Sequence, residues 1–239
     1  MSDASGTNGP RLLRSSTHDI NVVFQKKVDL VIGATGTKSL RDFGGLYLVH
    51  GRYLLEPAIA LEAEFASMVD ITPRPEFEDQ VQLAKQKNPK LTVEFVRADF
   101  RDLNLYQQLK PVDTSILFEV LLHQENYVGI LDQVSRITKN YICIAQPCLP
   151  DTAFGLPASA TLLQFWPEEL KDEYREGSMW PKEPRVDAFT TRYWMWAHTG
   201  SHLVSCLHGL GWRLEYGEEI PDIYGPKWHF LLMRFTRFN

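Results

Sequence analysis

Six polar residues come at or near the ends of apolar stretches between residues 39 and 147, and their side chains could do chemistry. They are Asp42, Asp70, Asp99, Glu119, His123 and Gln146. A carboxylate accepts hydrogen bonds from hydroxyl or amino groups, and histidine can take up a proton near neutral pH. Each residue could also be an ordinary solvated loop residue. Their repeated placement favours a functional site.

Strand and helix patterns alternate along this part of the chain and would position the six residues. The expected strands are Ser39 to Asp42, Phe65 to Asp70, Leu91 to Phe100, Val112 to Gln124 and Tyr141 to Pro147. Amphipathic segments separate them, including 76–87, a short helix at 101–109, and 126–139. This alternation predicts an α/β fold with a doubly wound, Rossmann-like parallel sheet. Because ligands bind beyond the carboxyl ends of such strands, the six residues should face one crevice.

The two flanks of this region extend the pattern. Residues 17–34 have apolar positions at helical spacing, with Thr17 as a possible N-cap. Thr199 can cap a second helix that begins near Ser201. Two strand patterns, 212–220 and 227–238, then follow with a turn between them. They predict an antiparallel hairpin that closes one edge of the sheet.

A glycine-rich loop follows the first strand of the alternation. Gly44, Gly45 and Gly51 come after Asp42 and lead into a helical pattern. Glycine allows a backbone to approach a nucleotide closely, and the N-terminus of the next helix offers free N–H groups. An ordinary tight turn between a strand and a helix would also need glycine.

Residues 148–196 differ from the rest because they are rich in proline and aromatic residues. We expect an aromatic-rich lid inserted in a single domain that spans residues 17–239, after a disordered tail at 1–16. The aromatic rings of the lid could line a pocket for a sugar or a planar ring. They could equally form a dimer contact.

Composition disfavours several classes of function. The 239 residues carry a formal net charge of -5 and no long basic run, which does not suggest a nucleic-acid partner. We also find no signal peptide and no apolar run long enough to cross a membrane. The three cysteines have no C-x-x-C spacing, so we expect free thiols in the cytoplasm.

The pattern over residues 37–147 and 199–237 resembles the class I S-adenosylmethionine-dependent methyltransferases. This resemblance implies a seven-stranded sheet whose last strand is antiparallel. It implies contacts from Asp42, Gly44 and Gly45 to the methionine part of S-adenosylmethionine. The sequence departs from the family pattern at Leu46, where the family has its second glycine.

The resemblance also assigns residues further along the chain. Asp70 would bind the ribose hydroxyls, Asp99 the adenine amino group, and Phe100 would pack on the adenine ring. Residues 118–124 match the fourth-strand motif, whose end lies next to the transferred methyl group, and Glu119 in this motif is a candidate cofactor-binding residue.

The function that we expect is O-methylation of a hydroxyl on a small polar molecule or sugar. His123 is the candidate general base, because proton removal activates a hydroxyl. The candidate acceptor-binding residues are His50, Tyr193, Trp194, Trp196 and His198. We predict no metal ligands, although His198 and His202 are four residues apart and a magnesium ion near the acidic residues is a minor option.

Several alternatives remain open from the sequence. The degenerate glycine loop would fit a non-catalytic binding or dimer-partner subunit. A nicotinamide-dependent oxidoreductase is a weaker option, because G-x-G-x-x-G is absent. N-methylation and a homodimer are both compatible with the sequence.

Overall fold

A computed structural model describes residues 13–14, 19–46, 49–151, 159–162, 196–221 and 228–238. In the first half of the chain, its elements are β1 (Leu13–Arg14), α1 (Ile20–Ile32), β2 (Ser39–Phe43), α2 (Arg52–Ala60), β3 (Phe65–Asp70), α3 (Pro75–Lys87), β4 (Thr92–Arg97) and the 3-10 helix η1 (Leu103–Gln107). The second half contains β5 (Val112–Phe118), the 3-10 helix η2 (Leu121–His123), α4 (Tyr127–Ile137), β6 (Thr138–Cys148), β7 (Ala160–Leu162), β8 (Trp196–His198), α6 (Gly200–Gly209), β9 (Trp212–Pro221) and β10 (His229–Arg237).

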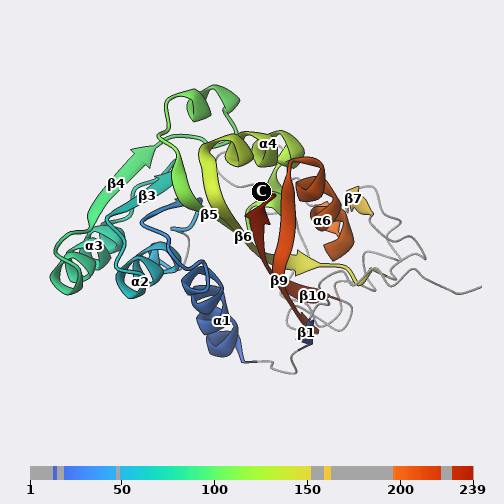
Figure 1. Cartoon of the computed structure of the whole chain (residues 1–239), viewed down its shortest axis with the longest axis horizontal. Coiled ribbons are helices and arrows are strands. Elements are labelled where there is room, and N and C mark those ends of the chain that lie inside the picture. Colours follow the sequence, from blue (N-terminus) through green and yellow to red (C-terminus); the bar gives the residue numbers. More distant parts are fainter. Residues whose placement is uncertain are drawn as a thin grey trace, which may run out of the picture.

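The central feature is one mixed sheet with the strand order β1-β9-β10-β6-β5-β2-β3-β4 (Figure 1). Strands β2 to β6 pair in parallel, and β10 is antiparallel to both β6 and β9. This confirms the doubly wound sheet and its antiparallel last strand. Strand β1 adds an eighth strand, parallel to β9, so residues 13 and 14 belong to the sheet although they lie within the predicted tail.

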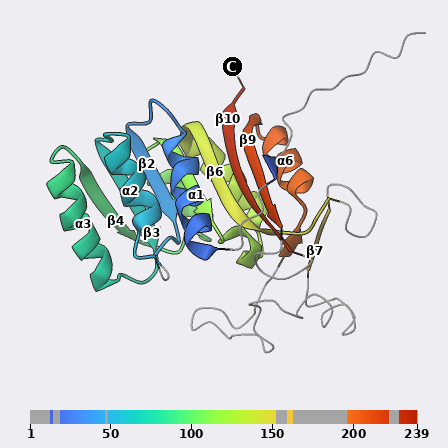
Figure 2. The ribbon, with the colours of Figure 1, turned by 90° about the horizontal axis from the view of Figure 1, so that it is seen from below.

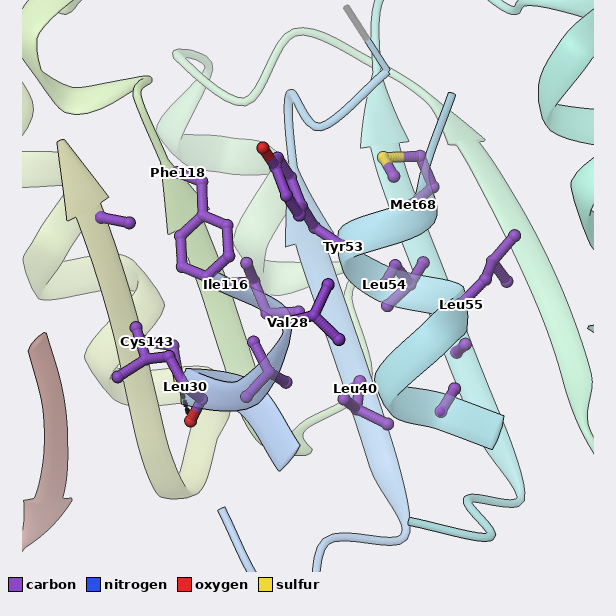
Figure 3. Packing of buried hydrophobic residues seen from close by; sticks show 14 of the residues in the cluster. Val28, Leu30, Leu40, Tyr53, Leu54, Leu55, Met68, Ile116, Phe118 and Cys143 are labelled. Carbon is purple, nitrogen blue, oxygen red and sulfur yellow. Dashed lines mark hydrogen bonds between the residues drawn. The ribbon is translucent and has the colours of Figure 1, made fainter. Parts of the chain in front are cut away.

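Helices cover both faces of the sheet. Figure 2 shows α1, α2 and α3 over one face, where Val28, Leu54 and Met68 belong to one buried cluster that Figure 3 shows from close by. The other face packs against η1, α4 and α6, through residues such as Ile130 and Leu203. We call the edge of the sheet at which β2, β3, β4, β5, β6 and β9 end the carboxyl edge. Among the described residues, no helix is long and apolar enough to cross a membrane.

The structure corrects several predicted boundaries. The strand expected to run to Gln124 ends at Phe118, because Glu119 has a positive φ of 56° and the chain then forms η2. The strand expected to reach Phe100 ends at Arg97. Helix α1 begins at Ile20 with Asp19 as its N-cap, rather than at Thr17. The short helix at 101–109 is the 3-10 helix η1.

Other predictions hold or cannot be followed. Thr199 caps α6 as predicted, since its side chain accepts a hydrogen bond from the backbone N–H of His202. Most of the expected lid lies outside the described residues, and so do Tyr193 and Trp194.

Candidate active site

Buried polar atoms without a hydrogen-bond partner mark the carboxyl edge. They are Asp42 Oδ1 and Oδ2, His50 Nδ1, Gln124 Oε1, Gln146 Oε1 and His198 Nε2. Asp42 and Gln146 lie near the ends of β2 and β6, and His50 and Gln124 lie in the connections after β2 and β5. His198 lies on β8, which contacts β6 and η2. Buried polar atoms are nearly always paired in folded proteins, so their concentration at one edge indicates a site for polar ligands.

Asp42 is the most strongly perturbed acid at this edge. Its side chain is fully buried, and burial raises its pKa to about 8, with a further contribution from the nearby Asp70 carboxylate. Its carboxylate lies against Gly45, where an added Cβ would be only 1.9 Å from Asp42 Oδ2. A cation beside Asp42 would therefore stabilise the charged form of its carboxylate, which burial disfavours.

The glycine loop is shaped by its protein neighbours. Gly44 has a φ of 78°, and a Cβ there would lie 3.0 Å from Val120 Cγ1 and 3.2 Å from Phe100 Cε1. Phe100, predicted to pack on adenine, thus lies over Gly44. Gly51 also has a φ of 78° and caps α2. Two of the three loop glycines therefore have backbone conformations that other residues rarely adopt.

Asp70 lies at the end of β3, as predicted, and is half-buried. Burial raises its pKa, while hydrogen bonds from backbone N–H groups, including that of Thr72 at 3.1 Å, oppose this shift. The N–H of Leu46 in the glycine loop is one of these groups. The carboxylate of Asp70 is therefore held next to the loop that follows β2.

Asp99 is engaged by a neighbouring side chain. Arg101 Nε donates to both carboxylate oxygens at 2.8 and 2.9 Å, and Arg101 Nη2 lies 2.6 Å from Asp99 Oδ2. Burial alone would raise the pKa of Asp99, but the hydrogen bonds from Arg101 outweigh it and the pKa is lowered. An adenine amino group would have to share this carboxylate with Arg101.

Glu119 forms an ion pair that the sequence analysis missed. Lys27 Nζ on α1 lies 2.6 Å from Glu119 Oε2, and only 3% of the Lys27 side chain is exposed. The same ammonium lies over the rings of Tyr53 and Phe230, at 5.1 and 4.7 Å from their centroids. Lys27 falls four residues from both Val23 and Val31 on the apolar face of α1. A lysine on the apolar face of a predicted helix is the sequence signal that could have indicated a buried ion pair.

The candidate base lies beside this edge rather than at the end of a strand. His123 is the last residue of η2 and is exposed to solvent. The corrected end of β5 thus places four residues between the strand and His123. His50, in the glycine loop, has a positive φ of 52°.

Trp196 and His198 meet side chains from α4, α6 and β6. His198 Nδ1 and the Gln146 amide nitrogen are hydrogen-bonded at 3.0 Å, and Trp196 Nε1 donates to the Gln124 carbonyl oxygen at 3.0 Å. The Tyr127 ring lies 4.5 Å from the His198 ring and 5.3 Å from that of Trp196. The structure therefore brings together two of the predicted acceptor-binding residues with Gln146, which was expected to face the crevice, and with two residues to which the sequence analysis gave no role, Gln124 and Tyr127.

Metal-ligating residues do not cluster in the part of the chain that is described. No group of three or more histidine, cysteine, aspartate or glutamate residues there could hold a metal ion. The His198 and His202 rings lie 5.8 Å apart and nearly parallel.

Comparison with solved structures relates most of the chain to methyltransferase folds. The chain is similar to the N-terminal domain of EvdMO1, crystallised with S-adenosylhomocysteine (SAH) and D-fucose, at 13% identity and a TM-score of 0.54, over 90% of this chain and 84% of that one. It is also similar to 1,6-didemethyltoxoflavin-N1-methyltransferase from Burkholderia thailandensis, at 14% identity and a TM-score of 0.56, over 93% of this chain and 84% of that one.

A third similar structure is the N-methyltransferase NodS from Bradyrhizobium japonicum, at 9% identity and a TM-score of 0.53, over 92% of this chain and 97% of that one. No protein-family model and no curated protein sequence match the chain. The fold is thus that of class I S-adenosylmethionine-dependent methyltransferases, as the sequence pattern predicted.

Proposed function

We propose that this protein is an S-adenosylmethionine-dependent methyltransferase that methylates a hydroxyl on a small polar molecule or sugar. The observation that carries the proposal is the concentration of unpartnered buried polar atoms at the carboxyl edge of a methyltransferase fold. The similar structures include O- and N-directed enzymes and one that was crystallised with D-fucose. They support methyl transfer more strongly than they support any one acceptor.

The residues at the end of β2 fit the cofactor by their chemistry. The α-amino group of S-adenosylmethionine would give Asp42 the cationic partner that its buried carboxylate lacks. Asp70, at the end of the neighbouring β3, would accept hydrogen bonds from the ribose hydroxyls. Asp99 and Phe100 would contact the adenine, with Arg101 competing for Asp99.

The bound cofactor would supply an activated methyl group. The residues of the chain would then orient the acceptor and remove its proton. Glu119 is held at the end of β5 by the buried ammonium of Lys27, where its conformation is fixed. His123 would accept the hydroxyl proton at a ring nitrogen, and its exposed position allows the proton to pass to water.

A methylation assay tests this function. We would measure SAH formation from S-adenosylmethionine with a panel of sugars, glycosides and planar heterocycles. Replacement of His123 by Gln should lower the rate by about 10²–10⁴-fold, the usual contribution of a general base. Full activity of His123→Gln would contradict the assignment of the base. A lack of turnover in the wild type with bound SAH would favour a non-catalytic subunit.

A further inference from the structure

Three of the unpartnered buried atoms belong to residues on the side of the sheet that packs against α4 and α6. They are Gln124 Oε1, Gln146 Oε1 and His198 Nε2. Gln146 and His198 are 0% exposed, and Gln124 is 9% exposed. Trp196 links the set, because its indole N–H donates to the Gln124 carbonyl oxygen and it lies on β8 with His198.

The hydrogen-bonding capacity of this set does not depend on how the Gln146 amide is oriented. If its nitrogen donates to His198 Nδ1, the remaining groups are the His198 Nε2–H donor and the Gln146 Oε1 acceptor. With the amide turned over, the remaining groups are an amide N–H donor and an Nε2 acceptor. At these two unpartnered positions, either arrangement leaves one donor and one acceptor. Gln124 Oε1 adds a second acceptor, since Gln124 Nε2 donates to the Val120 carbonyl oxygen.

The three side chains of the set are uncharged, and aromatic rings lie beside them. Burial lowers the pKa of His198 to about 3, with a further contribution from His202, so its ring is neutral at physiological pH. The Tyr127 ring meets those of His198 and Trp196 edge to face. Its hydroxyl is already hydrogen-bonded to His202 Nε2, at 2.6 Å. A charged ligand would lose its hydration here without gaining an opposite charge from this set.

We propose that Gln124, Gln146 and His198 form the acceptor-recognition site, and that its ligand is an uncharged ring with neighbouring hydrogen-bond donors and acceptors. A sugar or a lactam has this chemistry, whereas a carboxylate or an amine does not. The inference rests on the proposed function, because the site lies beside β6 and η2, next to the expected position of the methyl group. The cost of leaving these buried atoms unpaired would be recovered when the acceptor binds.

The test uses the full chain saturated with SAH, with ¹⁵N-labelled histidine, followed by NMR. The probes are D-fucose as a neutral polyol, 2-pyridone as a lactam, and D-galacturonate as a charged sugar. We expect saturable shifts of the His198 signals with D-fucose, 2-pyridone or both, and none with D-galacturonate. A response to one neutral probe alone identifies the hydroxyl or the lactam as the preferred chemistry. The exposed His208 at the other end of α6 is the internal control.

The variant Gln146→Leu/His198→Phe should lose SAH-dependent binding of the neutral probes, measured by calorimetry, while His208→Phe should retain it. If the double variant does not fold, Gln124→Leu removes the Oε1 acceptor, together with the hydrogen bond from Nε2 to the Val120 carbonyl oxygen, and should weaken probe binding several-fold. The inference is overturned if neither neutral probe moves the His198 signals, as for a site filled by water, or if D-galacturonate moves them equally. Calorimetry of SAH on the same wild-type sample separates the two proposals, because absent SAH binding would instead contradict the proposed function.

Discussion

At the scale of single residues, Asp42 couples the candidate cofactor site to the stability of the fold. Burial raises its pKa to about 8, whereas an aspartate in an unfolded chain titrates near 3.9. The folded state therefore keeps a proton that the unfolded state loses. The contribution of Asp42 to stability is fully present below about pH 4 and is lost as the pH rises through about 8.

Replacement of Asp42 by Asn should remove this pH dependence. We expect Asp42→Asn to melt at a higher temperature than the wild type at pH 8 and at a similar temperature at pH 4. Thermal melts followed by circular dichroism between these pH values would measure the difference. A constant difference across the whole range would show that Asp42 does not titrate as proposed.

Lys27 gives a second prediction at this scale. Lys27→Met keeps the aliphatic stem but leaves Glu119 without its ammonium partner. We expect a loss of about 2 kcal/mol in the free energy of unfolding, less than for a fully buried pair because Glu119 is partly exposed.

The adjacent Lys26 provides the matched control for this experiment. It pairs with Glu218 at 2.7 Å but is 28% exposed, and Glu218 also accepts a hydrogen bond from the Tyr216 hydroxyl. Lys26→Met should therefore cost less than Lys27→Met in urea unfolding. Equal losses would mean that burial of Lys27 adds nothing to its pair.

At the scale of elements, Gly51 connects the glycine loop to α2 and packs against α3. A Cβ at Gly51 would lie 2.5 Å from two ring carbons of Phe77 on α3, and its φ is 78°. Gly36 has a similar φ of 76° but has no atom within 4 Å of its added Cβ. Both alanine variants should pay about 1–2 kcal/mol for the left-handed backbone. Gly51→Ala should lose more in urea unfolding, because Phe77 must move; equal losses would contradict the clash.

The bounds of an element were predictable from the sequence where the apolar periodicity stops at a residue that breaks helices or strands. Strand β3 and helix α3 were placed almost to the residue, because an acid and a proline-containing break bound them. The end of β5 was misplaced because Val120, Leu121 and Leu122 continue its apolar run. Their burial comes from packing of η2, which periodicity cannot separate from a strand.

Side-chain pairings across the sheet were not predictable in this way. The ion pair between Lys27 and Glu119 joins residues 92 positions apart, and the Gln146–His198 hydrogen bond joins residues 52 apart. Asp99 was correctly placed near a strand end, but its pairing with Arg101 depends on the local turn. Such contacts depend on register and rotamers, which composition and spacing do not determine.

At the scale of the whole molecule, the carboxyl edge is the proposed shared site for cofactor and acceptor. Asp42 lies near the end of β2 and His50 on the loop after it, whereas Gln124, Gln146 and His198 lie on the side of α4 and α6. In this proposal the first group lies on the cofactor side of the edge, and the second group binds the acceptor. The sequence pattern predicted this edge from the strand ends alone. The antiparallel β10 pairs with β6 and lies between β6 and β9.

Calorimetric titration with SAH is the direct test of cofactor binding, with NAD as the control ligand and with and without magnesium. We expect binding of SAH with micromolar affinity, no binding of NAD, and a loss of about tenfold or more for Asp70→Asn, equivalent to about 1.4 kcal/mol. Binding of NAD in place of SAH would contradict the account and favour an oxidoreductase. A failure of both to bind would mean that the loop carrying Leu46 does not form the cofactor site.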